Sequence, residues 1–347
     1  DLVTMKWFND VWMKEVFANF MADKIMNPAF PDINHNLQFL TAHYSSAYDE
    51  DRTKGSHPIR QNLTNLKNAG SLYGSIIYNK APIMMRQLET TMGKEVFQKG
   101  IQKYIQKYAN SNADWEDLVE ILDKGTTLNM KKWSDVWVNQ SGRALFTDHI
   151  EYGDAQTIKN FVLRQQAEDG SPNVWPQIFE IGLVYPDTIK VIQVNVNSRI
   201  TEIKEAIGLQ KPISVIYNYN GYGYGVFPID PNNLDKTPEI KDEVARAYSY
   251  INAYENTLTG KITAVKAFDV FVKGIAVEQN ELIVKLLSNQ LSSIFWDFLT
   301  IKQQVVAQAE LEQLLFNKLQ TELPSNIKKT IFGLFESIAY SKTGKEK

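Results

Sequence analysis

Hydrophobic positions along the chain follow two different periods, and the changes between them divide the sequence into three regions. Up to about Phe146, apolar residues recur every three or four positions, as in amphipathic helices. Between residues 157 and 219 the pattern becomes an alternation rich in β-branched residues, which is typical of strands. After Glu239 the helical period returns. We therefore predict a multidomain, mainly α protein that contains a small antiparallel β-sandwich.

The first region is expected to be almost entirely helical. Its opening stretch, Leu2 to Met21, is predicted to form a helix almost from the first residue, with Asn27-Pro28 ending it. Pro82 interrupts the helical pattern of residues 69–88, where it either kinks the helix or, as we favour, lies in a first turn, in which its missing N–H costs nothing. The other expected helices of this region cover residues 36–48, 69–88, 93–104, 115–122 and 130–139.

Strands and then helices are expected in the rest of the chain. The Tyr- and Gly-rich run from Tyr217 to Gly225 is interpreted as a final strand whose glycines allow close backbone contact. The strands are expected at residues 157–166, 177–185, 188–197 and 212–219, and the later helices at residues 245–254, 262–271, 278–299, 307–319 and 325–341. Those helices suggest a bundle or a HEAT-like helical array. The predicted domains are 1–146, 147–231 and 232–347.

Composition narrows the class of protein without identifying it. The 347 residues are 44% hydrophobic and 22% charged, which is ordinary for a globular protein. The formal net charge of -3 gives no basic excess, so we expect no nucleic-acid partner. No apolar run approaches the length of a transmembrane helix, so no membrane-spanning segment is expected. Cysteine is absent, which excludes disulfides and thiolate ligands.

Standard catalytic motifs are missing from the sequence. The four histidines, His35, His43, His57 and His149, are not spaced to put two metal ligands on one helix face. We expect each of them to be structural or solvated. Neither HExxH nor GxSxG occurs, so the residues alone cannot assemble a standard metal or nucleophile site.

Glu15 is the residue that calls for an explanation. It lies in a stretch with Val11, Trp12, Phe17 and Ala18, and burying a carboxylate there is costly without a cation or a metal. Taken by itself, the pattern favours a Glu15 that faces solvent or meets an Arg or Lys.

The segment from Leu2 to Ala18, LVTMKWFNDVWMKEVFA, resembles the one that follows the zinc motif in M1-family (gluzincin) aminopeptidases, written TxxWWNDLWLNEGFA. The resemblance implies that Glu15 is the third zinc ligand, and that the two histidines of HExxH stand upstream of Asp1. It also implies that the chain is a C-terminal fragment that begins inside a thermolysin-like catalytic domain. Where the family has Asn-Glu-Gly, this chain has Lys14-Glu15-Val16, and Lys14 is expected to point away from its neighbour.

A second stretch, from Ile76 to Leu88, resembles the family's YEKGAxVLRML element. The resemblance implies that Tyr78 donates its hydroxyl to the oxyanion of the tetrahedral intermediate, and that Tyr73 lies in the substrate pocket. By itself the pattern would favour Tyr78 as a core aromatic. The stretch from Trp133 to Gly142 resembles the family's element near the end of the catalytic domain.

The resemblance implies a hydrolase: a zinc metallopeptidase that removes N-terminal residues from peptide substrates, with zinc (Zn²⁺) as its cofactor and zinc-bound water as the nucleophile. We expect the chain alone to lack zinc and to be inactive. Export to the periplasm or cell envelope is favoured over the cytoplasm. The oligomeric state stays open. One alternative is a non-catalytic M1-like interaction scaffold; another is a helical-repeat binding module in which Glu15 and Tyr78 lie on opposite faces.

Overall fold

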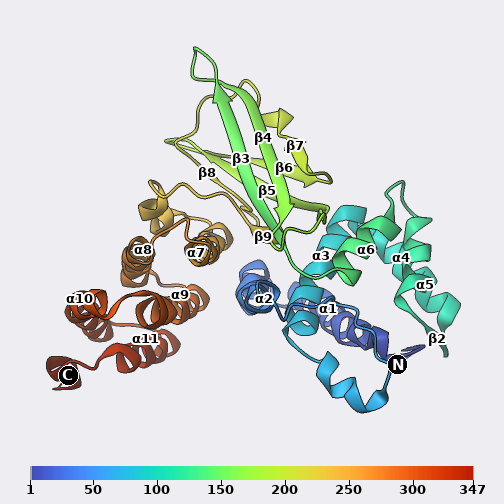
Figure 1. Cartoon of the computed structure of the whole chain (residues 1–347), viewed down its shortest axis with the longest axis horizontal. Coiled ribbons are helices and arrows are strands. Elements are labelled where there is room, and N and C mark those ends of the chain that lie inside the picture. The colour runs from blue at the N-terminus through green and yellow to red at the C-terminus, as the bar shows by residue number, and fades with distance from the viewer. Residues whose placement is uncertain (1, 347) are drawn as a thin grey trace. The chain divides into compact units, whose positions relative to one another are not determined.

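The computed structural model describes residues 2–346, so Asp1 and Lys347 lie outside the described residues (Figure 1). The protein combines many helices with small sheets. The contacts between Cα atoms group it into two compact units: one ends at Pro228, and the other holds Asn36–Thr41 and the residues from Ile229 onward. The three-domain division at residues 146 and 231 stays a prediction.

The opening residues form a strand before they form a helix. Strand β1 (Val3–Met5) pairs in parallel with β2 (Ser111–Ala113), and helix α1 runs from Val11 to Ala29. The prediction of a helix almost from the first residue is therefore wrong up to Trp7, whose indole N–H donates to the Leu63 carbonyl at 2.7 Å. The helix ends close to the predicted Asn27-Pro28 stop.

The helices predicted at residues 36–48, 93–104, 115–122 and 130–139 form close to their predicted bounds. The predicted helix 69–88 is wrong in its first part, because a 3₁₀ turn ends at Leu72 and the α-helix begins only at Ala81. Helix α5 begins at a capping box, in which Asp114 and Asp117 each accept the other's backbone N–H. A π-helical turn, Ile76–Lys80, leads directly into α3, and Pro82 lies in the first turn of α3 as predicted. The helices are α2 (His35–Asp51), α3 (Ala81–Met92), α4 (Lys94–Tyr108), α5 (Trp115–Asp123) and α6 (Met130–Asn139).

Two small sheets follow the helices of the first unit (Figure 1). One has the strand order β7-β4-β3-β9 and the other β6-β5-β8. Phe146 of the first sheet contacts Phe179 of the second, with ring centroids 5.7 Å apart, so apolar side chains fill the space between the sheets. The strands are β3 (Ala144–Tyr152), β4 (Ile158–Ala167), β5 (Gln177–Val184), β6 (Ile189–Val196), β7 (Ile200–Glu202), β8 (Ser214–Ile216) and β9 (Gly225–Val226).

The Tyr- and Gly-rich run folds mostly as a turn, so its interpretation as one continuous strand is wrong. The Asn218 side chain accepts the Gly223 N–H at 2.6 Å and donates to the Gly223 carbonyl, which closes the loop. Only its last residue, Gly225, belongs to a strand, and β9 pairs in parallel with β3. The close backbone contact expected of the glycines is confirmed, because a Cβ on Gly225 would lie 2.5 Å from the Ala144 carbonyl oxygen.

Buried hydrogen bonds connect the helices of the first unit with its sheets and the Tyr- and Gly-rich run. The Tyr44 hydroxyl donates to the Tyr222 carbonyl and the Tyr48 hydroxyl donates to the Gly225 carbonyl, each at 3.0 Å. From α3, the Gln87 side chain accepts the Ile178 N–H and donates to the Ile178 carbonyl. Side chains thus satisfy backbone groups that the short strands leave unpaired.

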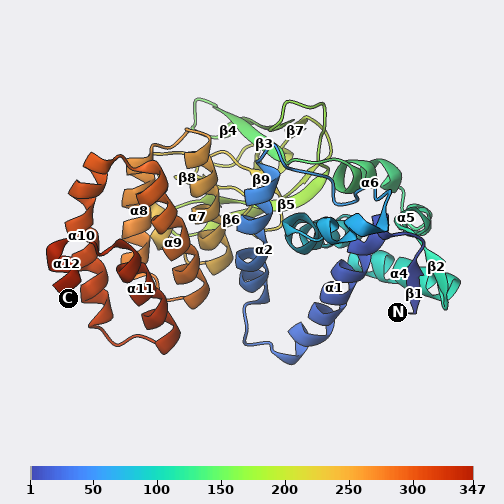
Figure 2. The same cartoon turned by 60° about the horizontal axis from the view of Figure 1, so that its bottom comes forward.

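The second unit is helical throughout, and its helices lie side by side (Figure 2). The predicted helix 278–299 is divided: α9 ends at Ser293 and a π-helical turn, Ile294–Phe298, follows it. The helices are α7 (Glu243–Leu258), α8 (Ala264–Val277), α9 (Glu281–Ser293), α10 (Ile301–Leu319), α11 (Ser325–Ile338) and α12 (Lys342–Glu346). No helix in residues 2–346 is long and apolar enough to cross a membrane.

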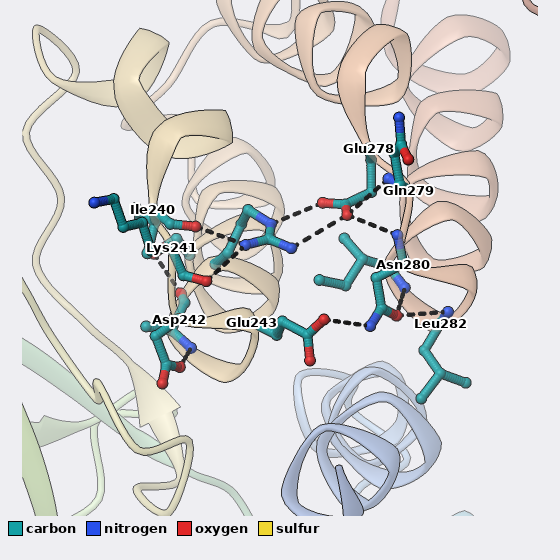
Figure 3. Close-up of polar contacts among 12 residues, drawn as sticks. Ile240, Lys241, Asp242, Glu243, Glu278, Gln279, Asn280 and Leu282 are labelled. Atoms are coloured by element: carbon teal, nitrogen blue, oxygen red, sulfur yellow. Dashed lines mark hydrogen bonds and ion pairs between the residues drawn. The ribbon is translucent and has the colours of Figure 1, made fainter. Parts of the chain in front are cut away.

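A polar network holds the turn between α8 and α9 against α7 (Figure 3). The Arg246 guanidinium contacts the Glu278 carboxylate at 2.8 Å and donates to the Ile240 carbonyl at 2.6 Å. Glu278 also accepts the backbone N–H of Asn280, whose side chain donates to Glu243. Side chains in this region also cap two helices: Asp242 accepts the Ala245 N–H at the start of α7, and Asn280 accepts the Leu282 N–H at the start of α9.

Candidate functional site

Glu15 lies in the second turn of α1 and is paired with a cation. Its side chain is 26% exposed, and its Oε1 lies 3.3 Å from the Lys14 Nζ. The expectation that Lys14 points away from its neighbour is therefore wrong, because the long lysine side chain bends back far enough to reach the carboxylate. The pair satisfies the charge that made Glu15 costly in an apolar segment.

Tyr78 is the exposed residue of a turn whose other side chains are mostly buried. Its side chain is 40% exposed, whereas Ile76, Ile77 and Lys80 in the same turn are buried. The turn is π-helical, with the Ala81 N–H donating to the Ile76 carbonyl, and such turns are frequent at functional sites. The structure contradicts the alternative in which Tyr78 is a core aromatic.

Tyr73 and Tyr78 stack on one another, with ring centroids 6.4 Å apart and planes inclined by 23°. Partial desolvation of the exposed phenol raises the pKa of Tyr78, the charge of Glu15 raises it further, and Lys14 lowers it. The hydrogen bond to Glu15 raises the pKa of Lys14, and both tyrosines add to that effect. Helix α1, which carries Glu15, also packs against the π-helical turn that carries Tyr78.

The turn that carries Tyr78 is held by a buried ion pair two residues further along. The Lys80 Nζ lies 2.7 Å from the Asp51 Oδ2, and both side chains are completely buried. Lys80 also donates to the Gly142 carbonyl, and the Tyr224 hydroxyl donates to Asp51 at 2.8 Å. This network ties the turn to the end of α2 and to the Tyr- and Gly-rich run.

Sequence reasoning missed Asp51, Lys80 and Tyr224 as supports of the site. The available signal was a lysine within the apolar sequence from Ile76 to Met85, which implies a buried partner. That partner is 29 positions away in the sequence, and only the fold identifies it.

All four histidines make hydrogen bonds, in agreement with their predicted structural role. His43 lies next to the site: its Nδ1 is 3.3 Å from the Asn79 Oδ1, and burial lowers the pKa of its ring. The other three contact Phe30, Pro58 and Glu151.

The residues at the site fit zinc only in part. Glu15 is a carboxylate of the kind that zinc accepts, and it is accessible and close to Tyr78. Within residues 2–346, however, no group of three or more His, Cys, Asp and Glu side chains could hold a metal ion. The described residues thus offer one ligand and do not form a zinc site by themselves.

Comparison with known proteins identifies the stretch that holds these residues. Residues 1–137 match the Peptidase family M1 domain. Aminopeptidase N of Streptomyces lividans is 26% identical over 312 residues, which cover 84% of this chain and 36% of the relative. Aminopeptidase M1-D of Oryza sativa is 35% identical over 171 residues, covering 49% of this chain and 20% of the relative.

A third relative, Tricorn protease-interacting factor F2 of Thermoplasma volcanium, is 23% identical over 307 residues, covering 85% of this chain and 36% of its own length. The chain therefore spans about a third of the length of the curated relatives that it matches over most of its own length. The matched domain contains Glu15, Tyr73 and Tyr78. Residues 1–137 therefore carry a Peptidase family M1 domain, and the chain over most of its length is similar to named aminopeptidases.

Proposed function

We propose that this chain is part of a zinc aminopeptidase that hydrolyses N-terminal residues from peptides, with Glu15 as a zinc ligand and Tyr78 as the donor to the oxyanion. The observation that carries the proposal is that α1, with Glu15, packs against the π-helical turn that carries the exposed Tyr78, and that both elements lie within the matched M1 domain. The activity belongs to the whole protein, since the relative from Streptomyces lividans is about two and a half times as long as this chain.

Zinc, when bound, supplies Lewis acidity and the activation of water as a nucleophile. Glu15 contributes a negatively charged oxygen ligand, and Lys14 must release that oxygen for it to serve. Tyr78, whose pKa is raised, keeps its proton at neutral pH and can donate a hydrogen bond to the oxygen on which negative charge develops. Tyr73 stacks on Tyr78 and fixes the direction of the ring.

We further propose that the chain alone holds no zinc and has no activity, because a single carboxylate is a weak site for a metal that takes three protein ligands. The test is the zinc content of the purified chain by mass spectrometry, together with an aminoacyl chromogenic substrate. Stoichiometric zinc or cleavage of that substrate would contradict this part of the proposal.

The catalytic role of Tyr78 is tested by Tyr78→Phe in the whole, zinc-loaded protein. Loss of one oxyanion donor is expected to lower kcat by about 10²–10³-fold. Tyr340→Phe is the matched control, since Tyr340 has a similar exposed fraction but lies in the second unit. An unchanged kcat for Tyr78→Phe would remove Tyr78 from the mechanism.

A non-catalytic M1-like scaffold is the second candidate, and one observation favours it. Lys14 already occupies the carboxylate that zinc would need. A scaffold would bind no zinc even as the whole protein, and Lys14→Asn, which restores the family residue, would not create a site. Zinc bound tightly by the wild-type whole protein would exclude this candidate.

A further inference from the structure

Lys14 is a cation placed among the residues of the proposed site. It precedes Glu15 on α1, and its side chain is 59% exposed. Its ammonium contacts the Glu15 carboxylate at 3.3 Å, and α1 packs against the π-helical turn that carries Tyr78. The ammonium therefore lies on the face of α1 that carries the proposed chemistry.

The pair between Lys14 and Glu15 cannot persist unchanged if Glu15 serves a metal. A carboxylate oxygen that ligates a dication has little charge left for an ammonium, and the dication repels the ammonium directly. Among the described residues, Glu15 is the acid paired with Lys14. Within these residues the ammonium would then remain exposed and without a negative partner.

A peptide substrate can supply the missing charge. Its backbone is neutral, and its free amine is repelled by an ammonium, so the group that Lys14 can attract is a carboxylate. Such a group occurs on an Asp or Glu side chain, or at the carboxyl end of a short peptide. Opposite charges across a binding site contribute chiefly to selectivity between substrates.

We propose that Lys14 is a specificity-determining residue that binds a carboxylate of the peptide substrate. The inference rests on the proposed function and adds the class of substrate: peptides with a negative charge beyond the residue that is removed. It concerns a position at which this chain departs from the Asn of the family pattern.

The test compares matched peptides with the whole, zinc-loaded protein. One pair is Leu-Glu-Ala-amide and Leu-Gln-Ala-amide, which differ in a side-chain carboxylate. The other is Leu-Gln-Ala with a free and with an amidated carboxyl end. In one of the two peptide pairs we expect kcat/KM to be about two- to five-fold higher for the member with the additional carboxylate, which is the size of an exposed ion pair. The peptide pair that shows this preference identifies whether Lys14 binds a side-chain or a terminal carboxylate.

Variants assign that preference to Lys14. Lys14→Met keeps the length of the side chain without the charge, and should bring the ratio of kcat/KM within the pair to about 1. Lys14→Arg should retain the preference. Lys24→Met is the matched control, since it removes the same charge from α1 at a lysine that pairs with Glu89.

The outcomes separate the two proposals. Failure of the wild type to cleave any of the three peptides overturns the proposed function and the inference together. Cleavage without a preference, or a preference that survives in Lys14→Met, overturns the inference alone.

A binding measurement avoids dependence on turnover. Glu15→Gln removes the partner of Lys14, so titration of this variant with Leu-Glu-Ala-amide should shift the NMR signal of the Lys14 Cε, with Lys14→Arg assigning that signal. Leu-Gln-Ala-amide and Leu-Gln-Ala with a free carboxyl end serve as the other ligands. Equal shifts with the charged and neutral members of both pairs would contradict the inference.

Discussion

Two Lys–carboxylate pairs involve residues next to Tyr78, and their surroundings are opposite. Lys80 and Asp51 are completely buried, 2.7 Å apart, and supported by further hydrogen bonds from Tyr224 and Gly142. Lys14 and Glu15 are partly exposed and 3.3 Å apart.

The difference in burial separates a pair that holds the structure from a pair at the proposed zinc site. A buried charge that loses its partner is left desolvated, so the Lys80–Asp51 pair holds one geometry of the turn that carries Tyr78. An exposed pair is worth about 0–1 kcal/mol, so the proposed exchange of Lys14 for a metal at Glu15 would cost little. A rigid tyrosine beside an exchangeable acid would suit the proposed zinc site.

The largest effect on stability is expected from Lys80→Met. It leaves the Asp51 carboxylate buried without its cation, and should lower the free energy of unfolding by about 3–5 kcal/mol. Urea denaturation followed by circular dichroism measures the change. A loss below about 1 kcal/mol would show that the buried pair does not hold the turn.

A smaller loss is expected from Tyr224→Phe, which removes a hydroxyl that donates to Asp51 at 2.8 Å. A hydrogen bond to a charged group contributes about 1.5–3 kcal/mol, so a decrease of that size should appear in the same denaturation experiment. In Lys80→Met the effect of Tyr224→Phe should differ from its effect in the wild type, because both groups contact one carboxylate. Strict additivity would contradict a shared network.

A third pair, Lys6 and Asp117 at 2.6 Å, has an exposure between those of the other two pairs. Its contribution to stability can be measured through its dependence on pH. Burial opposes ionisation of Asp117, but hydrogen bonds from Lys6, the Asp114 amide and Tyr108 outweigh it and lower its pKa to about 2. A lowered pKa stabilises the folded state above the unfolded pKa of about 3.9, and that stability is lost as the pH falls toward 2.

For this pair we expect a loss of about 1–2 kcal/mol between pH 4 and pH 2, allowing for screening by solvent. Asp117→Asn should remove that part of the pH dependence, as measured by urea denaturation at each pH. An unchanged slope in the variant would assign the acid sensitivity to other carboxylates.

The smallest effect is expected from Lys14→Met, which makes the same substitution as Lys80→Met at the exposed pair. The free energy of unfolding should change by no more than about 0.5 kcal/mol, as for most surface substitutions. Thermal or urea unfolding of the two variants side by side tests the comparison directly. A loss at Lys14 as large as that at Lys80 would remove the distinction between the two pairs.

The sequence predicted the elements that have a clear period and missed those that depend on distant partners. Helix α6 agrees with its predicted bounds, and β4 to β6 agree within a residue or so. Strand β3 was missed because its middle, Thr147 to His149, is polar and exposed, which hides the alternation. Strand β1 was missed because its partner β2 lies 108 positions away.

For the candidate site, the family resemblance identified Glu15 and Tyr78, and the periodicity could not. A π-helical turn contains an extra residue, so a count at 3.6 residues per turn places Tyr78 among the core positions of Ile76 and Ile77. The contact between Lys14 and Glu15 depends on the rotamer of a long side chain, which no sequence pattern specifies.

The most direct test of the zinc site is the affinity for zinc of the whole protein with Glu15 or with Glu15→Gln, measured by competition with a chelator. This substitution keeps the size of the side chain and removes the charge on its oxygen. We expect about one zinc per wild-type molecule and an affinity lower by at least about 10-fold in the variant, since a charged ligand is lost. Equal affinity for zinc in the two proteins would contradict the assignment of Glu15 as a ligand.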